Sequence, residues 1–453
     1  MSVYHLLGKR AQSRQPIRIG IIGAGRYGAM YLAQSRFIPG IQIVAIADLN
    51  MERARKALLC SGYDPGSIAL VKSSGEINDA AKQCRVALTT ESDKLIQSKI
   101  DVVIEITGTI EAAARHAWCA LETGKHVVMV STEADALVGC ALQKKAEERG
   151  VVYSFGYGDE PAELCELIDW ARTSGFEVVC VGKYIEYTPA KRYVNPSNVW
   201  DFKKNYTKEQ VASGELNAKL FSSFVDGTKT LTEACCAANA SGLIPPRGGM
   251  QFPPLEYDDM ANMLRPKSDG GILERCGTVE VPSNSHHDGT PVKNHLRWGV
   301  FISVRACSDY AASFLIDFRN EHRMMVDDTG HYGIMYRPTH ILGLELNKSV
   351  ASAALLGLPT GCPKTFTADM VAVAKKDLQP GESLDGPGAY TTYGQLVPAE
   401  ESMRRQYLPT GFSEKVQVVR SVKKDTILTY ADVSIDENLF SYKLRKQIET
   451  DQL

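Results

Sequence analysis

The sequence predicts an α/β protein: an N-terminal Rossmann doubly wound parallel sheet, then an α+β substrate and dimerisation domain, then a small C-terminal β module. Three observations predict this. Apolar and helical segments alternate in the first third, a glycine-rich turn follows the first apolar segment, and short segments separated by Gly and Pro occupy the end. With 453 residues, the chain has room for two or three domains. We place them at 1–158, 159–365 and 366–453.

The first domain is predicted from five apolar segments, of which the first four are each followed by a helical pattern. Strands are expected at 17–22, 41–48, 100–108, 125–132 and 151–156. The helical patterns include "RYGAMYLAQSR", "MERARKALLC" and the Ala-rich "TIEAAARHAWCALETG". Repeated strand–helix units indicate a parallel sheet with helices on both faces.

The turn after the first strand has the spacing G-x-G-x-x-G, in Gly23, Gly25 and Gly28. The first glycine permits a tight turn, the second lets the backbone approach a pyrophosphate, and the third lets the helix pack closely on the strand. The helix start, with Arg26 and Tyr27, then offers N–H groups and a positive dipole end to phosphates. This context predicts a dinucleotide coenzyme.

Two side chains bear on the choice between NAD and NADP. Asp48 ends the second strand, where an acid hydrogen-bonds a ribose diol, and alone it favours NAD because it would repel a 2′-phosphate. Arg53 lies five residues further on and could reach that phosphate. Both coenzymes therefore stay open.

The loops after the third and fourth predicted strands are expected to approach the nicotinamide. Ligands of open α/β sheets bind at the carboxyl ends of the strands. Thr107 and Gly108 lie at the carboxyl end of one predicted strand, and Ser131, Thr132 and Glu133 lie at the carboxyl end of the next. We assign all five to the coenzyme site. Glu105 lies just inside its strand and is expected to be structural.

Asp159 and Glu160 begin the second predicted domain, in a Gly-rich loop before Pro161. An acidic helix start complements the helix dipole, which is the structural interpretation. The functional interpretation is a carboxylate pair that faces the nicotinamide and holds a divalent metal such as Mg or Mn. The sequence leaves both open.

The candidate catalytic residues are Asp226, Lys229 and Glu233. On a helix, spacings of three and four place them on one face above an Ala- and Cys-rich apolar face. A lysine held by carboxylates can serve a reductase as proton donor or electrostatic stabiliser. A solvated surface is the alternative. Asn239 is a further polar candidate.

A second sheet is expected from strands within 295–306 and 311–320. Basic side chains in and around these segments are possible anion ligands. They are Arg297, Arg305, His331, Arg337 and His340.

Composition argues against several classes of partner. Lys and Arg total 51 against 53 for Asp and Glu, so the sequence shows no electrostatic signature of nucleic-acid or anionic-membrane binding. No apolar run approaches a membrane span, and the first residues do not follow the order of a secretory signal. The sequence has 11 cysteines, none of them in a C-x-x-C motif, and we expect them to be reduced thiols. Together these features predict a cytoplasmic protein that binds neither nucleic acid nor a membrane.

Several motifs resemble one enzyme family. "GIIGAGRYG", "DVVIEITG", "DGTKTLTEACCAANASGL" and "AKKDLQPGESLDG" are similar to segments of homoserine-dehydrogenase-like oxidoreductases with a C-terminal SAF module. More narrowly, the chain resembles the deoxyxylulose-phosphate reductoisomerase-like (DRL) enzymes. The SAF-like module is expected to serve oligomerisation or to form a lid.

The resemblance implies a homodimer or larger assembly and an NAD(P)H-dependent step on a polyol or sugar-phosphate-like substrate, with a divalent metal. In the best-known members, 1-deoxy-D-xylulose 5-phosphate becomes 2-C-methyl-D-erythritol 4-phosphate, a step of isoprenoid biosynthesis. The alternatives are a plain NAD(P)-dependent dehydrogenase of a sugar acid, polyol or amino-acid-derived alcohol such as homoserine, and a nucleotide-sensing scaffold without activity. One departure concerns the homoserine dehydrogenases, whose catalytic Asp and Lys lie four apart; Asp226 and Lys229 lie three apart.

Overall fold

The computed structural model describes residues 2–212, 216–296 and 299–452. The chain divides into two compact units. The first unit runs to Glu163 and also contains His340–Lys364 and the chain from Asn438 onward; the second contains Leu164–Thr339 and Thr365–Glu437. The three domains predicted from the sequence are a finer division and stay a prediction.

A seven-stranded sheet forms the centre of the first unit. All of its strand pairs are parallel, in the order β3-β4-β2-β1-β5-β6-β7, which confirms the doubly wound fold class. The strands are β1 (Ile17–Ile22), β2 (Ile41–Ala47), β3 (Ile68–Leu70), β4 (Val86–Thr89), β5 (Val102–Glu105), β6 (His126–Met129) and β7 (Tyr153–Phe155). The short strands β3 and β4 were not expected from the sequence, because three or four residues give too little apolar pattern.

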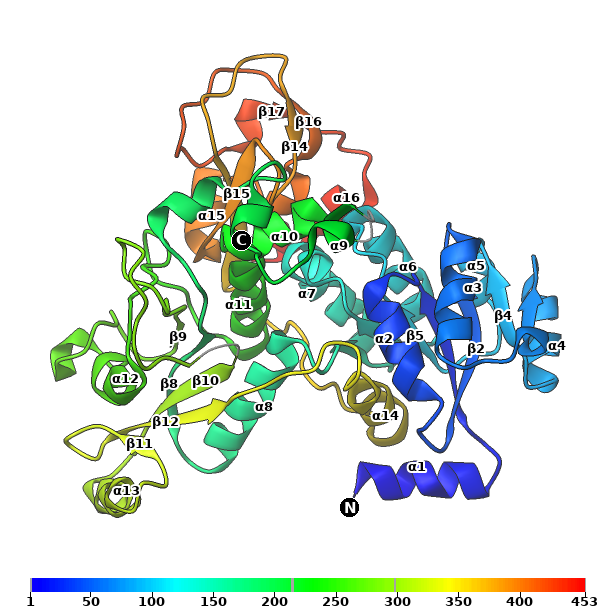
Figure 1. Cartoon of the computed structure of the whole chain (residues 1–453), viewed down its shortest axis with the longest axis horizontal. Helices are drawn as coiled ribbons and strands as arrows, with labels where there is room; N and C mark the ends of the chain where they lie inside the picture. Colours follow the sequence, from blue (N-terminus) through cyan, green and yellow to red (C-terminus); the bar gives the residue numbers. More distant parts are fainter. Residues whose placement is uncertain (1, 213–215, 297–298, 453) are drawn as a thin grey trace. The chain divides into compact units, whose positions relative to one another are not determined.

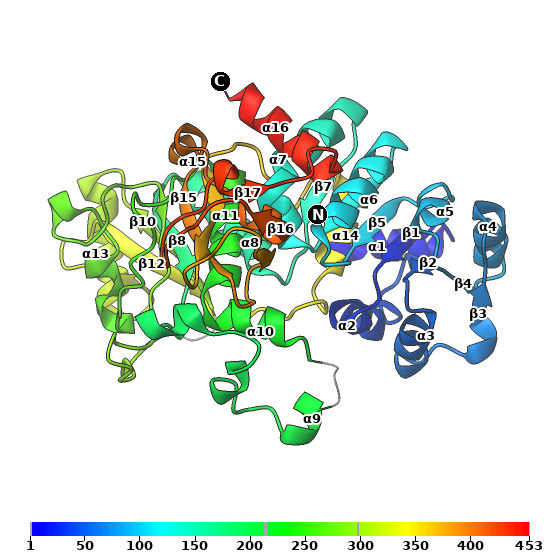
Figure 2. The same ribbon diagram turned by 90° about the horizontal axis from the view of Figure 1, so that it is seen from above.

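Helices cover both faces of this sheet (Figure 2). Leu32 of α2, Leu58 of α3 and Val350 of α14 pack in one buried cluster with the strands, while α6 and α7 lie on the other side. The helices of the first unit are α1 (Val3–Gln12), α2 (Arg26–Ser35), α3 (Met51–Cys60), η1 (Pro65–Ser67), α4 (Ser74–Lys82), α5 (Ser92–Ile96), α6 (Ile110–Glu122), α7 (Thr132–Arg149), α14 (Asn347–Leu356) and α16 (Phe440–Asp451).

The second unit contains a five-stranded sheet in the order β11-β12-β10-β8-β9 (Figure 1). Its central strand β10 pairs antiparallel with both neighbours. The strands are β8 (Glu177–Lys183), β9 (Thr278–Val279), β10 (Val300–Arg305), β11 (Met325–Val326) and β12 (Tyr332–Arg337). The helices before the last of these strands are α8 (Glu160–Thr173), whose first residues belong to the first unit, η2 (Pro189–Tyr193), η3 (Val199–Asp201), α9 (Lys208–Ala212), α10 (Ala218–Val225), α11 (Thr228–Ser241), η4 (Tyr257–Asp259), α12 (Met260–Met263), η5 (Lys267–Asp269) and α13 (Asp309–Asn320).

The strand expected at 311–320 is wrong, since this segment lies within the helix α13. The Ser308 side chain caps the helix by accepting the Ala311 N–H at 3.2 Å. Ala312 and Leu315, three residues apart, are the buried positions, which is a helical spacing. The bulky Phe and Ile residues gave the segment a strand-like composition, but the cap and this spacing decide for a helix.

The C-terminal strands belong to the second unit. Strand β13 (Ala368–Ala374) pairs antiparallel with β15 (Thr392–Pro398), and both contact α11. The remaining elements are β14 (Ser383–Asp385), α15 (Ala399–Arg405), η6 (Thr410–Phe412), β16 (Glu414–Val418), η7 (Tyr430–Asp432) and β17 (Val433–Ser434). Within the described chain, no helix combines the length and the apolar character that crossing a bilayer would require.

Candidate functional site

The glycine-rich turn has the geometry that its spacing predicts. Gly23 has a φ of 99°, and a Cβ there would lie 2.8 Å from the Ile106 carbonyl oxygen, so only glycine fits. A Cβ on Gly25 would meet nothing within 4 Å, which leaves open space at the N-cap of α2. A Cβ on Gly28 would come within 3.0 Å of the Gly23 carbonyl oxygen. Arg26 and Tyr27 form the first turn of α2.

Asp48 holds this turn from the end of β2. Its carboxylate accepts the Ala24 N–H at 2.6 Å and the Asn50 N–H at 2.7 Å, and it pairs with the Arg53 guanidinium at 2.9 Å. The Asp48 side chain is only 2% exposed, whereas that of Arg53 is 55% exposed. Groups within the protein thus occupy much of the hydrogen-bond-accepting capacity of the Asp48 carboxylate. A ribose hydroxyl would have to share these oxygens with them.

Glu105 organises the loops that follow β5 and β6. Its fully buried carboxylate accepts the Thr107 hydroxyl at 2.6 Å and the Ser131 hydroxyl at 2.8 Å. Ser131 in turn accepts the Gly108 N–H at 3.1 Å, and His116 Nδ1 lies 3.3 Å from Glu105. The expectation of a structural role for this acid agrees with these contacts, which brace both strand ends. Thr132 and Glu133 form the first turn of α7.

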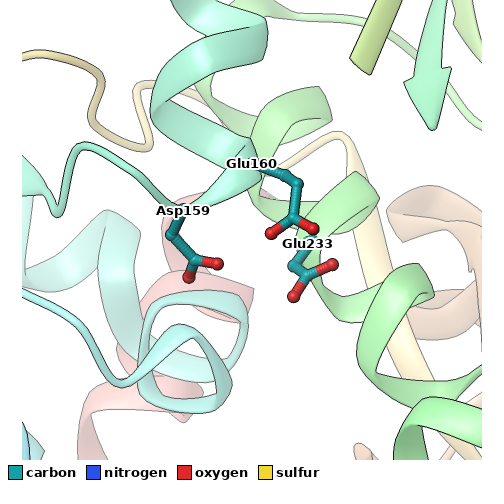
Figure 3. A group of neighbouring side chains, drawn as sticks. All are labelled: Asp159, Glu160 and Glu233. Carbon is teal, nitrogen blue, oxygen red and sulfur yellow. The ribbon is translucent and has the colours of Figure 1, made fainter. Parts of the chain in front are cut away.

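Asp159 and Glu160 are buried where α8 begins (Figure 3). His340 Nε2 lies 3.2 Å from a Glu160 carboxylate oxygen, and His340 Nδ1 lies 3.0 Å from the Gly158 carbonyl oxygen. A carbonyl only accepts, so Nδ1 must carry a proton. In a neutral ring, Nε2 then presents a lone pair beside a carboxylate. Two acceptors facing one another in this way would need a proton or a cation between them.

Lys229 and Glu233 lie on α11, as predicted, and Glu233 is drawn in Figure 3. Their charged atoms are 3.8 Å apart. Lys183, at the end of β8, binds the same Glu233 carboxylate at 2.6 Å. Sequence reasoning missed Lys183, because no spacing along the chain relates a strand end to a helix 50 residues later. The Glu233 carboxylate therefore has two lysine ammonium groups as partners.

Asp226 does not share a helix face with Lys229, which corrects the prediction. Helix α10 ends at Val225, and Gly227 has a φ of 89°, so the chain turns before α11 begins. The Asp226 carboxylate instead lies 2.9 Å from the Lys375 ammonium, and both side chains are buried. Burial raises the pKa of Asp226, and the lysine counteracts part of that increase.

Lys375 also donates to two backbone carbonyls, those of Val194 at 2.6 Å and Ala389 at 2.9 Å. Asn239 is likewise committed to structure. Its amide bonds the backbone of Ala368 from both ends, which ties α11 to β13.

Most of the other candidate anion ligands are paired with acids. Arg305 pairs with Glu177, His331 lies 3.5 Å from Asp309, and Arg337 lies 3.4 Å from Glu166. Arg305 and His331 line a cavity of about 550 Å³. Arg297 lies outside the described residues.

Two family models match the chain. The NAD-binding domain of homoserine dehydrogenase matches residues 19–155, and the catalytic domain of the oxidoreductase DRL matches residues 158–346. These spans contain all the coenzyme, metal and catalytic residues predicted from the sequence.

Two related proteins match a smaller part of the chain than the two family models do together. A glyceraldehyde-3-phosphate dehydrogenase 1 of Giardia intestinalis is 32% identical over 137 residues, which are 28% of this chain and 40% of that protein. A 4-carboxy-2-hydroxymuconate-6-semialdehyde dehydrogenase of a Sphingobium species is 29% identical over 142 residues, 31% of this chain and 38% of that protein. The chain thus spans about two fifths of the length of these relatives.

Among solved structures, 1-deoxy-D-xylulose 5-phosphate reductoisomerase from Zymomonas mobilis, in complex with NADPH, is similar at 15% identity and a TM-score of 0.33. The match covers 49% of this chain and 58% of that one.

Proposed function

Because the chain is a homoserine-dehydrogenase-like oxidoreductase that resembles DRL, we propose that it reduces a small polyol- or sugar-phosphate-like substrate with NAD(P)H. The observation that carries the proposal is the glycine turn at 23–28, which Asp48 holds and which opens at Gly25. The bound coenzyme would supply the hydride. The second unit would supply the groups that bind and protonate the substrate.

NADP is the coenzyme that the contacts of Asp48 favour. An unpaired acid at this position would repel a 2′-phosphate, but the carboxylate of Asp48 is buried and neutralised by Arg53. The exposed guanidinium of Arg53 can then face the phosphate. The loops braced by Glu105 would position the nicotinamide side of the coenzyme.

Lys229 is the proposed acid of the reduction. When a hydride adds to a carbonyl carbon, the oxygen gains negative charge and takes a proton. An ammonium group can stabilise that charge and supply that proton. Lys183 lies closer to Glu233 than Lys229 does, and we propose that it positions this carboxylate. The acid role is therefore proposed for Lys229, which lies in the first turn of α11. Asp226 is proposed as a positioning residue, since its partner is Lys375.

Asp159 and Glu160 are proposed to hold a divalent metal. Two buried carboxylates form a hard oxygen donor set, and His340 offers a further lone pair beside Glu160. The carbonyl of Gly158 would fix the His340 ring, as second-shell acceptors do for metal-bound histidines. Such a metal would polarise substrate oxygens, which an isomerisation before reduction requires.

The narrower proposal is the reductoisomerase reaction, in which 1-deoxy-D-xylulose 5-phosphate is rearranged and reduced to 2-C-methyl-D-erythritol 4-phosphate. It is supported by the match to the DRL catalytic domain. We also propose that residues 366–453 include an SAF-like module, that the protein assembles as a homodimer or larger oligomer, and that it acts in the cytoplasm.

The test combines coenzyme binding with turnover. Calorimetry with NADPH and NADH should show binding, tighter for NADPH, and NADPH oxidation should follow addition of 1-deoxy-D-xylulose 5-phosphate. EDTA should abolish that oxidation, and added Mn²⁺ should restore it. Absence of binding by either coenzyme would refute the oxidoreductase proposal. Binding with oxidation of a panel alcohol, unaffected by EDTA, would instead indicate the plain dehydrogenase.

A further inference from the structure

Arg192 ends the short helix η2 in the second unit, and its side-chain contacts are with tyrosines. The guanidinium Nε donates to the Tyr187 hydroxyl at 3.3 Å and the group lies 5.6 Å from the Tyr393 ring centroid. The neighbouring Tyr193 hydroxyl also interacts with it. Among the described residues, no carboxylate forms an ion pair with Arg192. The positive charge of a half-buried guanidinium is therefore met only by neutral groups.

Two of these tyrosines, Tyr193 and Tyr393, donate their hydroxyl protons to one carboxylate. Asp425 accepts the Tyr193 hydroxyl at 2.7 Å and the Tyr393 hydroxyl at 3.2 Å, so these two protons are committed. The Lys424 ammonium lies 3.7 Å from the Tyr193 ring centroid. Arg192 and Lys424 together outweigh Asp425, and the cluster keeps a net positive charge.

Tyr187 can still donate. Its hydroxyl receives a hydrogen bond from Arg192, which leaves its own proton for another acceptor. Burial raises the pKa of Tyr187, so the hydroxyl is protonated at neutral pH. An oxygen anion beside Arg192 would thus find a cation and an O–H donor.

A strained aromatic stack supports Tyr187. Phe252 stacks on it with ring centroids 3.9 Å apart, although Phe252 has a φ of 49°, a conformation that bulky residues rarely adopt. Strain of this kind persists where the surrounding structure enforces it, and it concentrates at functional sites. A Cβ on Gly227 would lie 3.5 Å from the Tyr187 ring and 3.6 Å from that of Phe252. Gly227 immediately precedes α11, which carries Lys229.

We infer that Arg192, with the Tyr187 hydroxyl, binds an oxyanion group of the substrate, either a phosphate or a carboxylate. Guanidinium groups match both anions, with paired N–H donors. The stack of Tyr187 and Phe252 would set the anion at one end of a substrate whose carbonyl faces Lys229. This inference rests on the proposed function for the identity of the ligand as substrate, but the anion site itself can be tested separately.

The test measures binding of inorganic phosphate and of acetate to the full chain by calorimetry, for the wild type and for Arg192→Met. Arg404→Met is the matched control, because Arg404 is an exposed arginine of the same unit. We expect Arg192→Met to weaken phosphate or acetate binding at least tenfold and the control to leave it unchanged. The anion that binds more tightly identifies the charged group of the substrate. Equal affinities in wild type and Arg192→Met, for both anions, would overturn the inference.

A second readout does not depend on how well the variant folds. In the wild type, phenylglyoxal labelling of arginines, mapped by mass spectrometry, should show phosphate protecting Arg192 and not Arg404. Labelling of Arg192 that is insensitive to both anions would also overturn the inference. NADPH titration of the same samples separates the two proposals. Wild-type protein that binds NADPH but neither anion, or that binds the anions no more tightly than Arg192→Met does, counts against the Arg192 site alone. Absence of NADPH binding counts against the proposed oxidoreductase function and leaves the anion site at Arg192 unaffected.

Discussion

Two buried acids of the first unit and two of the second have partners of different kinds. In the first unit, Glu105 is held by hydroxyls, and Asp48 is held by backbone N–H groups as well as by an exposed arginine. In the second unit, Asp226 and Glu233 are held by lysines. Hydroxyls and amides fix geometry without adding charge, which suits a cradle for a coenzyme. Ammonium groups place a positive charge beside the acid, and a cation can stabilise a substrate oxygen that becomes negative.

We expect the largest effect from a substitution that breaks the buried ion pair of the second unit. Lys375→Met leaves Asp226 buried without its cation, and losing one partner of such a pair typically costs about 3–5 kcal/mol. We expect the free energy of unfolding, measured in urea, to fall by that order. The double variant Asp226→Asn/Lys375→Met should recover much of the loss.

Lys376→Met is the control for this experiment, because Lys376 is adjacent in sequence but half exposed. It should change stability by less than about 1 kcal/mol. A Lys375→Met protein as stable as the control would contradict the contrast between the units.

Lys229→Met tests whether the ammonium group of Lys229 takes part in the reaction. We expect kcat to fall by roughly 100-fold or more, the range typical of a lost general acid, with the Kd for NADPH unchanged. Lys219→Met, also in the second unit but paired with Glu414, should retain activity. Unaltered turnover in Lys229→Met would remove Lys229 from the site.

Glu280 extends the comparison, since it is a buried acid of the second unit whose carboxyl group accepts the Val281 N–H. Burial raises the pKa of Glu280 to about 7, above the 4.5 of an exposed glutamate. The native state therefore keeps a proton that the unfolded state loses between these values. Stability from this group is full below pH 4.5 and is lost as pH rises through about 7, by up to about 3 kcal/mol.

The corresponding variant is Glu280→Gln, which cannot ionise. We expect its Tm to exceed that of the wild type at pH 8 by more than it does at pH 5. Glu274→Gln, at an exposed site of the same unit, should show no such pH dependence. A pH-independent difference for Glu280→Gln would mean that the carboxyl is ionised in the native protein.

The smallest effect concerns the coenzyme choice of the first unit. Arg53→Met should weaken NADPH binding about tenfold and leave NADH binding nearly unchanged, because the lost contact is with one exposed phosphate. Arg55→Met is the control, because Arg55 lies two residues further along the same helix and is also exposed. If both coenzymes weaken equally, Arg53 acts only by holding Asp48.

Much of the first unit could be read from its sequence. The strands β1 and β2 and the helices α2, α3 and α6 lie close to their predicted positions, because their apolar periods are long and the glycine turn is specific. Shorter elements such as β3 gave no usable pattern. In the second unit, the segment of α13 was assigned to a strand, since its composition outweighed the spacing of only two buried residues.

The sequence alone determined the local features: the glycine turn at 23–28, the acid at the end of β2, and the helical spacing that joins Lys229 to Glu233. Only the tertiary structure decided the long-range partners, Lys183 for Glu233, Lys375 for Asp226 and tyrosines for Arg192. The physical reason is that helical and turn geometry relates residues a few positions apart. Which distant side chains meet is set by how strands and helices pack, and burial makes those meetings necessary because an ionised group removed from water needs a counter-charge.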